Sequence, residues 1–348
     1  NKNTMTEIIV QKFGGTSVGA VERIDAVAEI IKDSSKSNNI VVVVSAMEGE
    51  TNKLVGLANH FSQSPDKREF DALVSTGETV SSALLAIALN AKGINAKSYS
   101  ASQISMKTTD SYSKAKILDI DANKILEVVG QNTIPIITGF QGITETGDIT
   151  TLGRGGSDTT AVAIAAQIGA KRCDIYTDVD GVFTTDPKVV PNAKKLDSIT
   201  MEEMLELAGQ GAKVMQTRAV EFANKYKVPV RVLSSFSEGD GTLISLKDDG
   251  MENATISGIA FQKDQVKFTL HGVGDTPGTA FKILGPISEK DIEVDVIVQN
   301  VSVDGKTDFT FTVSKEDESD VKGIIEEIKK EVEFKDLMIN SDIAKVSL

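Results

Sequence analysis

TLGRGGSDTTA, the stretch at residues 151–161, surrounds Arg154 with three glycines and leads directly into a Ser-Asp-Thr-Thr run. The following residues, AVAIAAQIGA (161–170), are apolar and alanine-rich, which predicts a buried helix with Ser157 or Asp158 as its N-cap. A glycine loop before a helix presents backbone N–H groups and the positive end of the helix dipole. The Arg154 guanidinium adds a fork that matches a carboxylate or phosphate. The stretch therefore predicts an anion site, with an ordinary glycine-rich turn as the alternative.

Strand-like and helix-like segments alternate on both sides of this loop. Apolar runs rich in β-branched residues predict strands, and apolar residues at helical spacing predict helices between them. Such alternation predicts an α/β fold in three layers, α/β/α, with a mostly parallel central sheet. The predicted strands are 7–13, 39–47, 95–104, 133–144, 173–179 and 228–236, and the predicted helices are 20–34, 48–61, 71–93, 115–130 and 200–226.

The C-terminal part of the chain follows a different pattern. Residues 239–253 are polar and rich in Gly and Asp, which is typical of a domain boundary. Beyond them the order β-α-β-β-α-β predicts a ferredoxin-like α+β domain. We therefore expect a first domain at 1–248 and a second at 254–348. The predicted elements of the second are strands 267–273, 294–302, 307–314 and 342–348, and helices 279–291 and 319–332.

Composition narrows the classes of function. The 348-residue chain has a net charge of −13, which argues against nucleic acid as a main partner. Cys173 is the only cysteine and the two histidines are far apart in sequence, so we expect neither a disulfide nor a Cys- or His-based metal site. We find no secretory signal and no apolar run of membrane-spanning length. These features predict a cytoplasmic protein without a membrane partner.

Further candidate residues are polar side chains near the ends of the predicted strands, where ligands bind in an open α/β sheet, and one glutamate in a helix. Lys12 precedes the loop GGTSVG (14–19) and either contacts an anion or is a solvated strand-end lysine. Ser45 lies at the end of the second strand and Thr51 follows it, both on the expected ligand side. Glu78 lies between a polar and an apolar stretch of a helix, so it faces either a cavity or solvent.

A second informative segment spans residues 171–191. Its strand ends at Asp178, and a glycine turn with Phe183 follows. This arrangement suits the edge of a nucleotide site, with a Mg²⁺ or ribose contact and an apolar wall, and a β-hairpin is the alternative. Lys213 follows a helix break at 209–211 and could approach phosphates.

Four segments, taken together and in order, resemble the signatures of the aspartokinases, which belong to the amino-acid kinase family. They are KFGGTSVG (12–19), SAMEGETN (45–52), TLGRGGSDTTA (151–161) and YTDVDGVFTTDP (176–187). GDTPG (274–278) followed by VQNVS (298–302) resembles the first half of that family's pair of regulatory ACT units. The resemblance covers the whole chain and implies an amino-acid-kinase fold with a C-terminal ACT domain.

The resemblance implies transfer of the γ-phosphoryl group of MgATP to the side-chain carboxylate of L-aspartate. The product, 4-phospho-L-aspartate, begins the biosynthesis of lysine, threonine and methionine. A carboxylate nucleophile is already ionised at neutral pH, so the reaction needs positioning and charge stabilisation rather than a general base. Mg²⁺ enters with ATP, and no separate metal site on the protein is expected. The alternatives are a kinase for another small acid or a nucleoside monophosphate, and a catalytically inactive amino-acid sensor.

The resemblance also implies a role for each matching residue. Lys12 and Asp158 are the implied catalytic pair, with Asp158 organising Lys12 at the transferred phosphoryl group. Arg154 is implied to pair with the α-carboxylate of aspartate and Glu78 with its α-ammonium. Phe183 stands where the family commonly has Tyr, which keeps the ring but loses a hydroxyl contact. The remaining implied residues are Ser45, Thr51 and Ser157 for aspartate, and Gly14, Gly15, Thr177, Asp178, Phe183, Lys188 and Lys213, with Lys12, for the nucleotide.

The regulatory part departs from the family pattern. Residues 256–261 and 344–348 resemble parts of the second ACT unit, so we expect the first unit to be complete and the second truncated. ACT units imply feedback control by lysine, threonine or both, and a homodimer or higher homo-oligomer. The candidate effector contacts are Asp275, Pro277, Gly278, Gln299 and Asn300.

Overall fold

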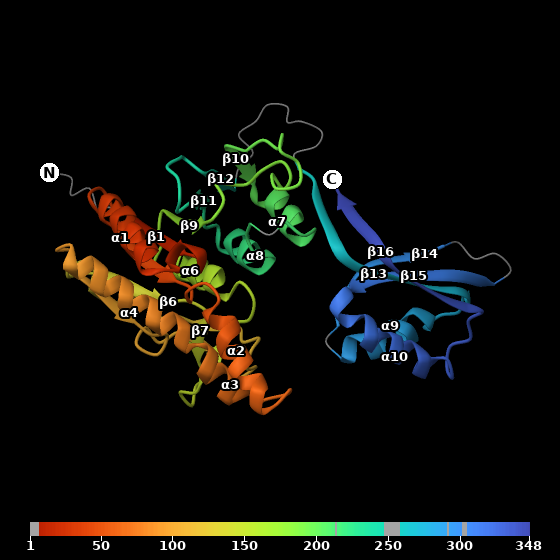
Figure 1. The fold of residues 1–348 in the computed structure, drawn as a ribbon. Helices are drawn as coiled ribbons and strands as arrows, with labels where there is room; N and C mark the ends of the chain where they lie inside the picture. Colours follow the sequence, from red (N-terminus) through yellow and green to blue (C-terminus); the bar gives the residue numbers. More distant parts are fainter. Residues whose placement is uncertain (1–6, 213, 247–257, 291, 301–304) are drawn as a thin grey trace. The chain divides into compact units, whose positions relative to one another are not determined.

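The structure is a computed structural model that describes residues 7–212, 214–246, 258–290, 292–300 and 305–348. The chain divides into two compact units, Asn1–Gly258 and Ile259–Leu348, which are described separately below (Figure 1).

An eight-stranded sheet forms the centre of the first unit. Its strand order is β10-β12-β11-β9-β1-β2-β6-β3, and all neighbours in it are parallel except β11 and β12. The mostly parallel sheet expected from the sequence is thus confirmed. The strands are β1 (Ile8–Phe13), β2 (Asn39–Val44), β3 (Ala96–Tyr99), β6 (Ile134–Thr138), β9 (Arg172–Thr177), β10 (Ser198–Thr200), β11 (Val230–Ser234) and β12 (Thr242–Ser245).

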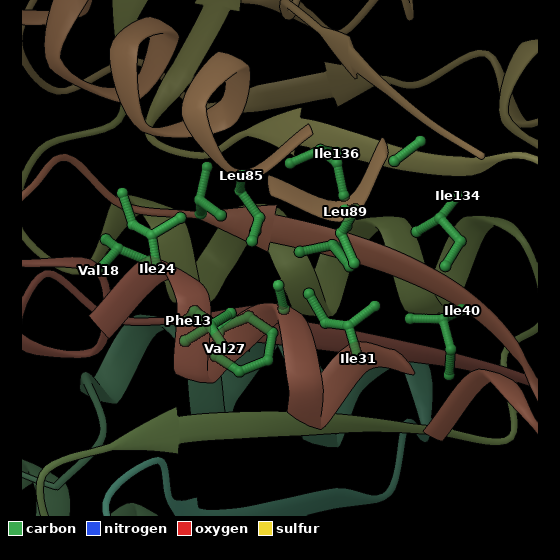
Figure 2. Packing of buried hydrophobic residues seen from close by; sticks show 14 of the residues in the cluster. Phe13, Val18, Ile24, Val27, Ile31, Ile40, Leu85, Leu89, Ile134 and Ile136 are labelled. Atoms are coloured by element: carbon green, nitrogen blue, oxygen red, sulfur yellow. The ribbon is translucent and has the colours of Figure 1, made fainter. Parts of the chain in front are cut away.

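Helices cover both faces of this sheet. On one face, α1 and α4 pack together on β1, β2 and β6, and Figure 2 shows Phe13, Ile31 and Leu89 within that core. On the other face, α6 packs against β1, β2 and β9 and contacts α8. The helices are α1 (Val21–Ser35), α2 (Glu50–Phe61), α3 (Lys67–Val74), α4 (Thr76–Ala91), α5 (Ala122–Gly130), α6 (Gly156–Gln167), α7 (Met201–Gly209) and α8 (Thr217–Tyr226), with a 3₁₀ turn η1 at Thr16–Val18.

The alternation of side chains along β1 decides where its lysine points. Ile9 and Phe13 belong to the core under α1 and α4. Because successive strand residues point to opposite faces of a sheet, Lys12 points to the face that α6 covers. Lys12 is thereby directed at the first turn of α6.

Several element boundaries differ from the sequence predictions. The single helix expected at 71–93 is two helices, α3 and α4, which meet at Ser75. The helix expected at 115–130 begins only at Ala122, because residues 117–119 pair as a strand. The strand expected at 95–104 ends at Tyr99.

The strand expected at 133–144 is broken at its middle, where Phe140 has a left-handed φ of 67°. Its first half is β6 and its second half is β7, which joins a small separate sheet of order β5-β4-β7-β8. The strands of this small sheet are β4 (Lys107–Thr108), β5 (Ile117–Asp119), β7 (Gln141–Ile143) and β8 (Ile149–Thr151).

The second unit has the expected β-α-β-β-α-β order. Its antiparallel sheet has the strand order β14-β15-β13-β16, and α9 and α10 contribute Ile283 and Ile325 to a core that also holds Phe268 and Phe311. The ferredoxin-like prediction is thus confirmed. The elements are β13 (Ala260–Gly274), α9 (Thr279–Glu289), β14 (Val294–Gln299), β15 (Lys306–Ser314), η2 (Lys315–Asp317), α10 (Glu318–Ile328) and β16 (Asp336–Ser347).

The last strand begins at Asp336, earlier than the predicted 342. Its end pairs with the beginning of β13, since Ala260 is opposite Ser347 and Phe261 is opposite Val346. The two segments assigned to a second ACT unit therefore pair with each other at residues 260–261 and 346–347; residues 256 and 257 lie outside the described residues.

One stretch, Lys67–Ala91, is long and apolar enough to span a membrane by length and composition, contrary to the sequence expectation. It comprises α3 and α4, and half of its most apolar window is buried inside the protein. Core helices pass the same test, so this stretch is weak support for a membrane span.

Candidate active site

A cavity of about 320 Å³ lies where the carboxyl ends of β1 and β2 meet the first turn of α6. This is the position at which open α/β sheets bind ligands. The cavity brings together eight of the residues predicted from the sequence, from four separate segments of the chain. They are Lys12, Gly15, Ser45, Thr51, Glu78, Arg154, Ser157 and Asp158.

Lys12 and Asp158 form an ion pair at this cavity. The distance between Lys12 Nζ and Asp158 Oδ1 is 2.7 Å, and each side chain is 11% exposed. Lys12 reaches this position from β1, and Asp158 projects from the first turn of α6. The pair combines a fixed cation with an open cavity, which is what stabilising a transferred phosphoryl group requires.

The two glycines after β1, Gly14 and Gly15, lie close to neighbouring parts of the chain. Gly14 N–H donates to the carbonyl of Tyr176 at 3.1 Å, so this amide is already engaged in the pairing of β1 with β9. A side chain at Gly14 would lie 3.4 Å from Lys12 Nζ, and one at Gly15 would lie 3.0 Å from the Ala46 carbonyl. Gly15 therefore lets the segment after β2 approach closely, and Gly14 lies beside the Lys12 ammonium.

Glu78 is buried in the first turn of α4, and only 3% of the residue is exposed. Its Oε1 accepts a hydrogen bond from Ala46 N–H at 3.1 Å, whereas its Oε2 is buried without a hydrogen-bond partner. Burial raises the pKa of the Glu78 carboxyl to about 7. An unsatisfied buried carboxylate oxygen at a cavity wall suits a cationic ligand group. The solvent-facing alternative for Glu78 is therefore wrong.

Arg154 lies at the tip of a tight turn between Gly153 and Gly155, whose φ angles are +76° and +68°. Its side chain is exposed, and within the described ranges no ion pair is found for it. A side chain at Gly155 would lie 2.0 Å from Gln216 Cγ, so this glycine is required by both its conformation and its packing. The turn thus presents an uncommitted guanidinium at the cavity.

The N-cap of α6 differs from the prediction. Gly155, in the left-handed conformation, is the N-cap, and Ser157 and Asp158 are inside the first turn. A glycine adopts that conformation without strain, so no side-chain cap is needed to turn the chain into the helix. As a result, Ser157 and Asp158 are available to face the cavity.

Ser157 depends on a glycine that sequence reasoning missed. A side chain at Gly139, just after β6, would lie 2.6 Å from Ser157 Oγ and 2.9 Å from the Val44 carbonyl. The sequence signal was the pair of glycines in TGFQG (138–142), which interrupts the apolar run of a predicted strand. Ser45 and Thr51 line the same cavity, from the end of β2 and the first turn of α2.

Of the residues predicted for the nucleotide, Lys12 and Gly15 line this cavity, whereas Gly14, Thr177, Asp178, Phe183 and Lys188 do not. Thr177 and Asp178 are at the carboxyl end of β9, the neighbour of β1, and Thr177 Oγ1 donates to Asp178 Oδ1 at 3.2 Å. Phe183 is half-buried and pairs with Lys195 through an isolated β-bridge. Lys188 is exposed, and Lys213 lies outside the described residues.

A larger cavity, of about 610 Å³, is lined by the amino-terminal residues of β2 and β6, at the opposite edge of the sheet. Its lining contains asparagines, Ser35, Thr133 and apolar residues but no ionisable side chain. It therefore lacks the charged groups that phosphoryl transfer needs. In the part of the chain that the structure describes, no group of three or more His, Cys, Asp or Glu could hold a metal.

Comparisons with known proteins agree with this geometry. The model of the amino acid kinase family matches residues 7–234, and that of the ACT domain matches residues 270–333. The aspartate kinase Ask_LysC of Stutzerimonas stutzeri is 55% identical over 343 residues, covering 98% of this chain and 83% of the relative. The aspartokinase of Mycobacterium tuberculosis is 44% identical over 347 residues, covering 98% of this chain and 82% of the relative.

Solved structures give the same result. Escherichia coli aspartokinase III in complex with aspartate and ADP is 26% identical with a TM-score of 0.80, covering 98% of this chain and 87% of that one. The same enzyme in complex with lysine and aspartate is 27% identical with a TM-score of 0.78, covering 98% and 86%. On its family match, its sequence identity to these relatives and its fold, the chain belongs to the amino acid kinase family and, within it, to the aspartokinases.

Proposed function

We propose that this chain transfers the γ-phosphoryl group of MgATP to the side-chain carboxylate of L-aspartate, which yields ADP and 4-phospho-L-aspartate. The observation that carries the proposal is one cavity that contains Arg154, the buried carboxyl of Glu78 and the Lys12–Asp158 ion pair. An α-amino acid is a zwitterion and needs one partner of each sign. Arg154 supplies the cation for its α-carboxylate, and Glu78 supplies the anion for its α-ammonium.

The reaction on this site requires no proton transfer. The side-chain carboxylate oxygen of aspartate forms a bond to the γ-phosphorus, the bond from that phosphorus to the β,γ-bridging oxygen breaks, and ADP leaves with the electron pair. Lys12 Nζ stabilises the negative charge of the transferred group, and Asp158 holds the ammonium in place. Ser45, Thr51 and Ser157 complete the amino-acid pocket.

The nucleotide is expected beside this pocket, at the end of β9. Thr177, Asp178 and Phe183 would contact it, and Gly14, Gly15, Lys188 and Lys213 would lie near its phosphates. Mg²⁺ enters as part of the substrate MgATP. The described residues offer no cluster of three metal-ligating side chains, so we expect phosphate oxygens to supply most of its ligands.

The second unit is expected to bind an amino-acid effector; the similar E. coli aspartokinase III was solved in complex with lysine and aspartate. Gln299 Nε2 donates to Asp275 Oδ1 at 3.3 Å, and Gly278 adopts a left-handed φ of 92° before α9. These residues, with Pro277 and Asn300, form the proposed contact set for lysine or threonine. We propose domain limits of 1–248 and 254–348, a homodimer or higher homo-oligomer, and a cytoplasmic location.

An ADP-release assay with a panel of acceptors tests the proposed function. L-Aspartate should give turnover with MgATP, while L-glutamate and aspartate blocked at its α-amino or α-carboxyl group should give little. Turnover with a nucleoside monophosphate or another small acid, and none with aspartate, would favour the alternative kinases. No ADP above background with any acceptor would favour an inactive sensor.

A further inference from the structure

A buried carboxylate outside the cavity holds the segment from which the Arg154 turn emerges. Asp71, in α3, is fully buried and accepts four hydrogen bonds. Two come from Ser113, from N–H at 2.8 Å and Oγ at 2.9 Å. The other two come from Thr151, from N–H at 2.7 Å and Oγ1 at 2.9 Å. One carboxylate thus ties a helix to two chain segments that are distant in sequence.

The two segments held by Asp71 flank the turn that carries Arg154. Thr151 ends β8, two residues before Gly153. The carbonyl of Ser113 lies 3.0 Å from where a side chain at Gly153 would begin, and Ser113 itself has a left-handed φ of 66°. A non-glycine residue in that conformation requires support from its surroundings, and the two bonds to Asp71 provide it.

Arg218, in α8, holds the same two segments from another side. Its Nη1 donates to the Leu152 carbonyl at 2.7 Å, and its Nη2 donates to the Ala115 carbonyl at 2.9 Å. In the described ranges no carboxylate forms an ion pair with Arg218, so its hydrogen bonds go to the backbone of these segments. Ala115 N–H in turn donates to the Thr151 carbonyl at 3.0 Å, so the two segments are also bonded directly to each other.

We propose that Asp71 and Arg218 are positioning residues that fix the Gly153–Arg154 turn for the α-carboxylate of the amino-acid substrate. Neither lines the cavity, so each acts through the backbone at 151–153 and not by touching substrate. Fixing the turn before binding lowers the ordering cost that a mobile arginine would incur. This inference rests on the proposed function, since it names how the substrate site of that reaction is held.

The test compares Asp71→Asn with Asp174→Asn, a second buried carboxylate that binds Arg172 and Arg231 and contacts no residue of the turn. The asparagine amide of Asp71→Asn cannot accept from all four donors, so the turn loosens. In Asp71→Asn we expect KM for aspartate to rise about tenfold and KM for ATP to stay within twofold. Arg218→Lys should change both constants in the same way. Asp174→Asn should lower thermal stability and leave KM for aspartate unchanged.

A second readout does not depend on activity. Amide hydrogen exchange of residues 151–156 should become faster in Asp71→Asn and remain as in the parent protein in Asp174→Asn. Thr151→Val removes only one hydroxyl donor, and it should raise KM for aspartate two- to fivefold even if Asp71→Asn does not fold. Unchanged KM and unchanged exchange in these variants would overturn the positioning role. Absence of turnover in the parent protein would overturn the proposed function, and the exchange result would still decide whether Asp71 holds the turn.

Discussion

Lys12 Nζ lies 2.7 Å from Asp158 Oδ1, and this ion pair joins the end of β1 to the first turn of α6. The geometry follows from two local features. Strand alternation turns Lys12 toward the face of the sheet that α6 covers, and a glycine N-cap leaves Asp158 uncommitted to capping. The pair thus holds a cation at the cavity where the phosphoryl group is expected.

Lys12→Ala should lower kcat by more than tenfold, because it removes the cation proposed to stabilise the transferred group. A tenfold loss corresponds to about 1.4 kcal/mol in the activation barrier. Steady-state ADP release measures the effect, with Lys36→Ala as a control because Lys36 pairs with Asp33 on the surface of α1. An unchanged kcat in Lys12→Ala would remove this residue from the mechanism.

Arg154→Ala should raise KM for aspartate at least tenfold and change KM for ATP by less than twofold. The guanidinium is the proposed partner of the α-carboxylate, and Arg154→Lys should restore only part of the affinity because an ammonium lacks the planar fork. Initial rates at varied aspartate and ATP separate the two constants. Arg68→Ala removes an exposed arginine on α3 and serves as the control. An effect confined to KM for ATP contradicts the assigned role.

The affinity for aspartate should increase with pH through about 7. Burial raises the pKa of the Glu78 carboxyl to about 7 from an ordinary 4.5, and only the ionised form attracts an ammonium group. Below the pKa, binding must first release a proton, so Kd for aspartate should be about tenfold higher at pH 6 than at pH 8.

Calorimetry in two buffers of different ionisation enthalpy measures this proton release directly. Near pH 6.5, aspartate binding should release most of a proton. Glu78→Gln should bind aspartate more weakly at pH 8 and should show neither the release nor the pH dependence. A parent protein whose affinity is flat between pH 6 and pH 8 would show that Glu78 does not bind the ammonium.

Gly139→Ala should reduce both stability and kcat/KM. The added methyl group would lie 2.6 Å from Ser157 Oγ and 2.9 Å from the Val44 carbonyl, so α6 or β2 must shift. Overpacking of this kind costs about 1–3 kcal/mol. Thermal unfolding and initial rates provide the measurements. Gly130→Ala is the matched control, because nothing lies within 4 Å of its added methyl group, and a Gly139→Ala protein that behaves like this control refutes the close approach.

Asp275→Ala should weaken amino-acid inhibition without changing the uninhibited kcat. Asp275 accepts from Gln299 at the proposed effector contact set. The concentration of lysine or threonine needed for half-inhibition should rise at least tenfold, whereas Glu289→Ala, at the exposed end of α9, should respond as the parent does. A parent protein that is insensitive to lysine, threonine and their mixture would contradict the effector proposal.

Features with local signals could be predicted from the sequence. The loop at 153–156 and the helix after it follow from glycines beside an apolar alanine-rich run, and the eight residues gathered at the cavity lie at the ends of strands, after strands or in the first turns of helices. The β-α-β-β-α-β order of the second unit could be predicted for the same reason, since each strand and helix has its own periodicity.

Features that depend on distant contacts could not be predicted. The four donors of Asp71 come from residues 113 and 151, so no pattern around residue 71 indicates them. Phe140 breaks a continuous apolar run by adopting a left-handed conformation that apolar periodicity cannot signal. The hydrogen bond from Gly14 N–H to the Tyr176 carbonyl likewise results from pairing between β1 and β9.

The most direct test of the central claim traps the product. An acyl phosphate reacts with hydroxylamine to give a hydroxamate, so the protein is incubated with MgATP, L-aspartate and hydroxylamine, and aspartyl hydroxamate is measured against a control without aspartate. The account predicts hydroxamate in proportion to the ADP released, and its loss in Lys12→Ala. Hydroxamate no higher than in the control without aspartate would contradict the claim that this chain phosphorylates aspartate.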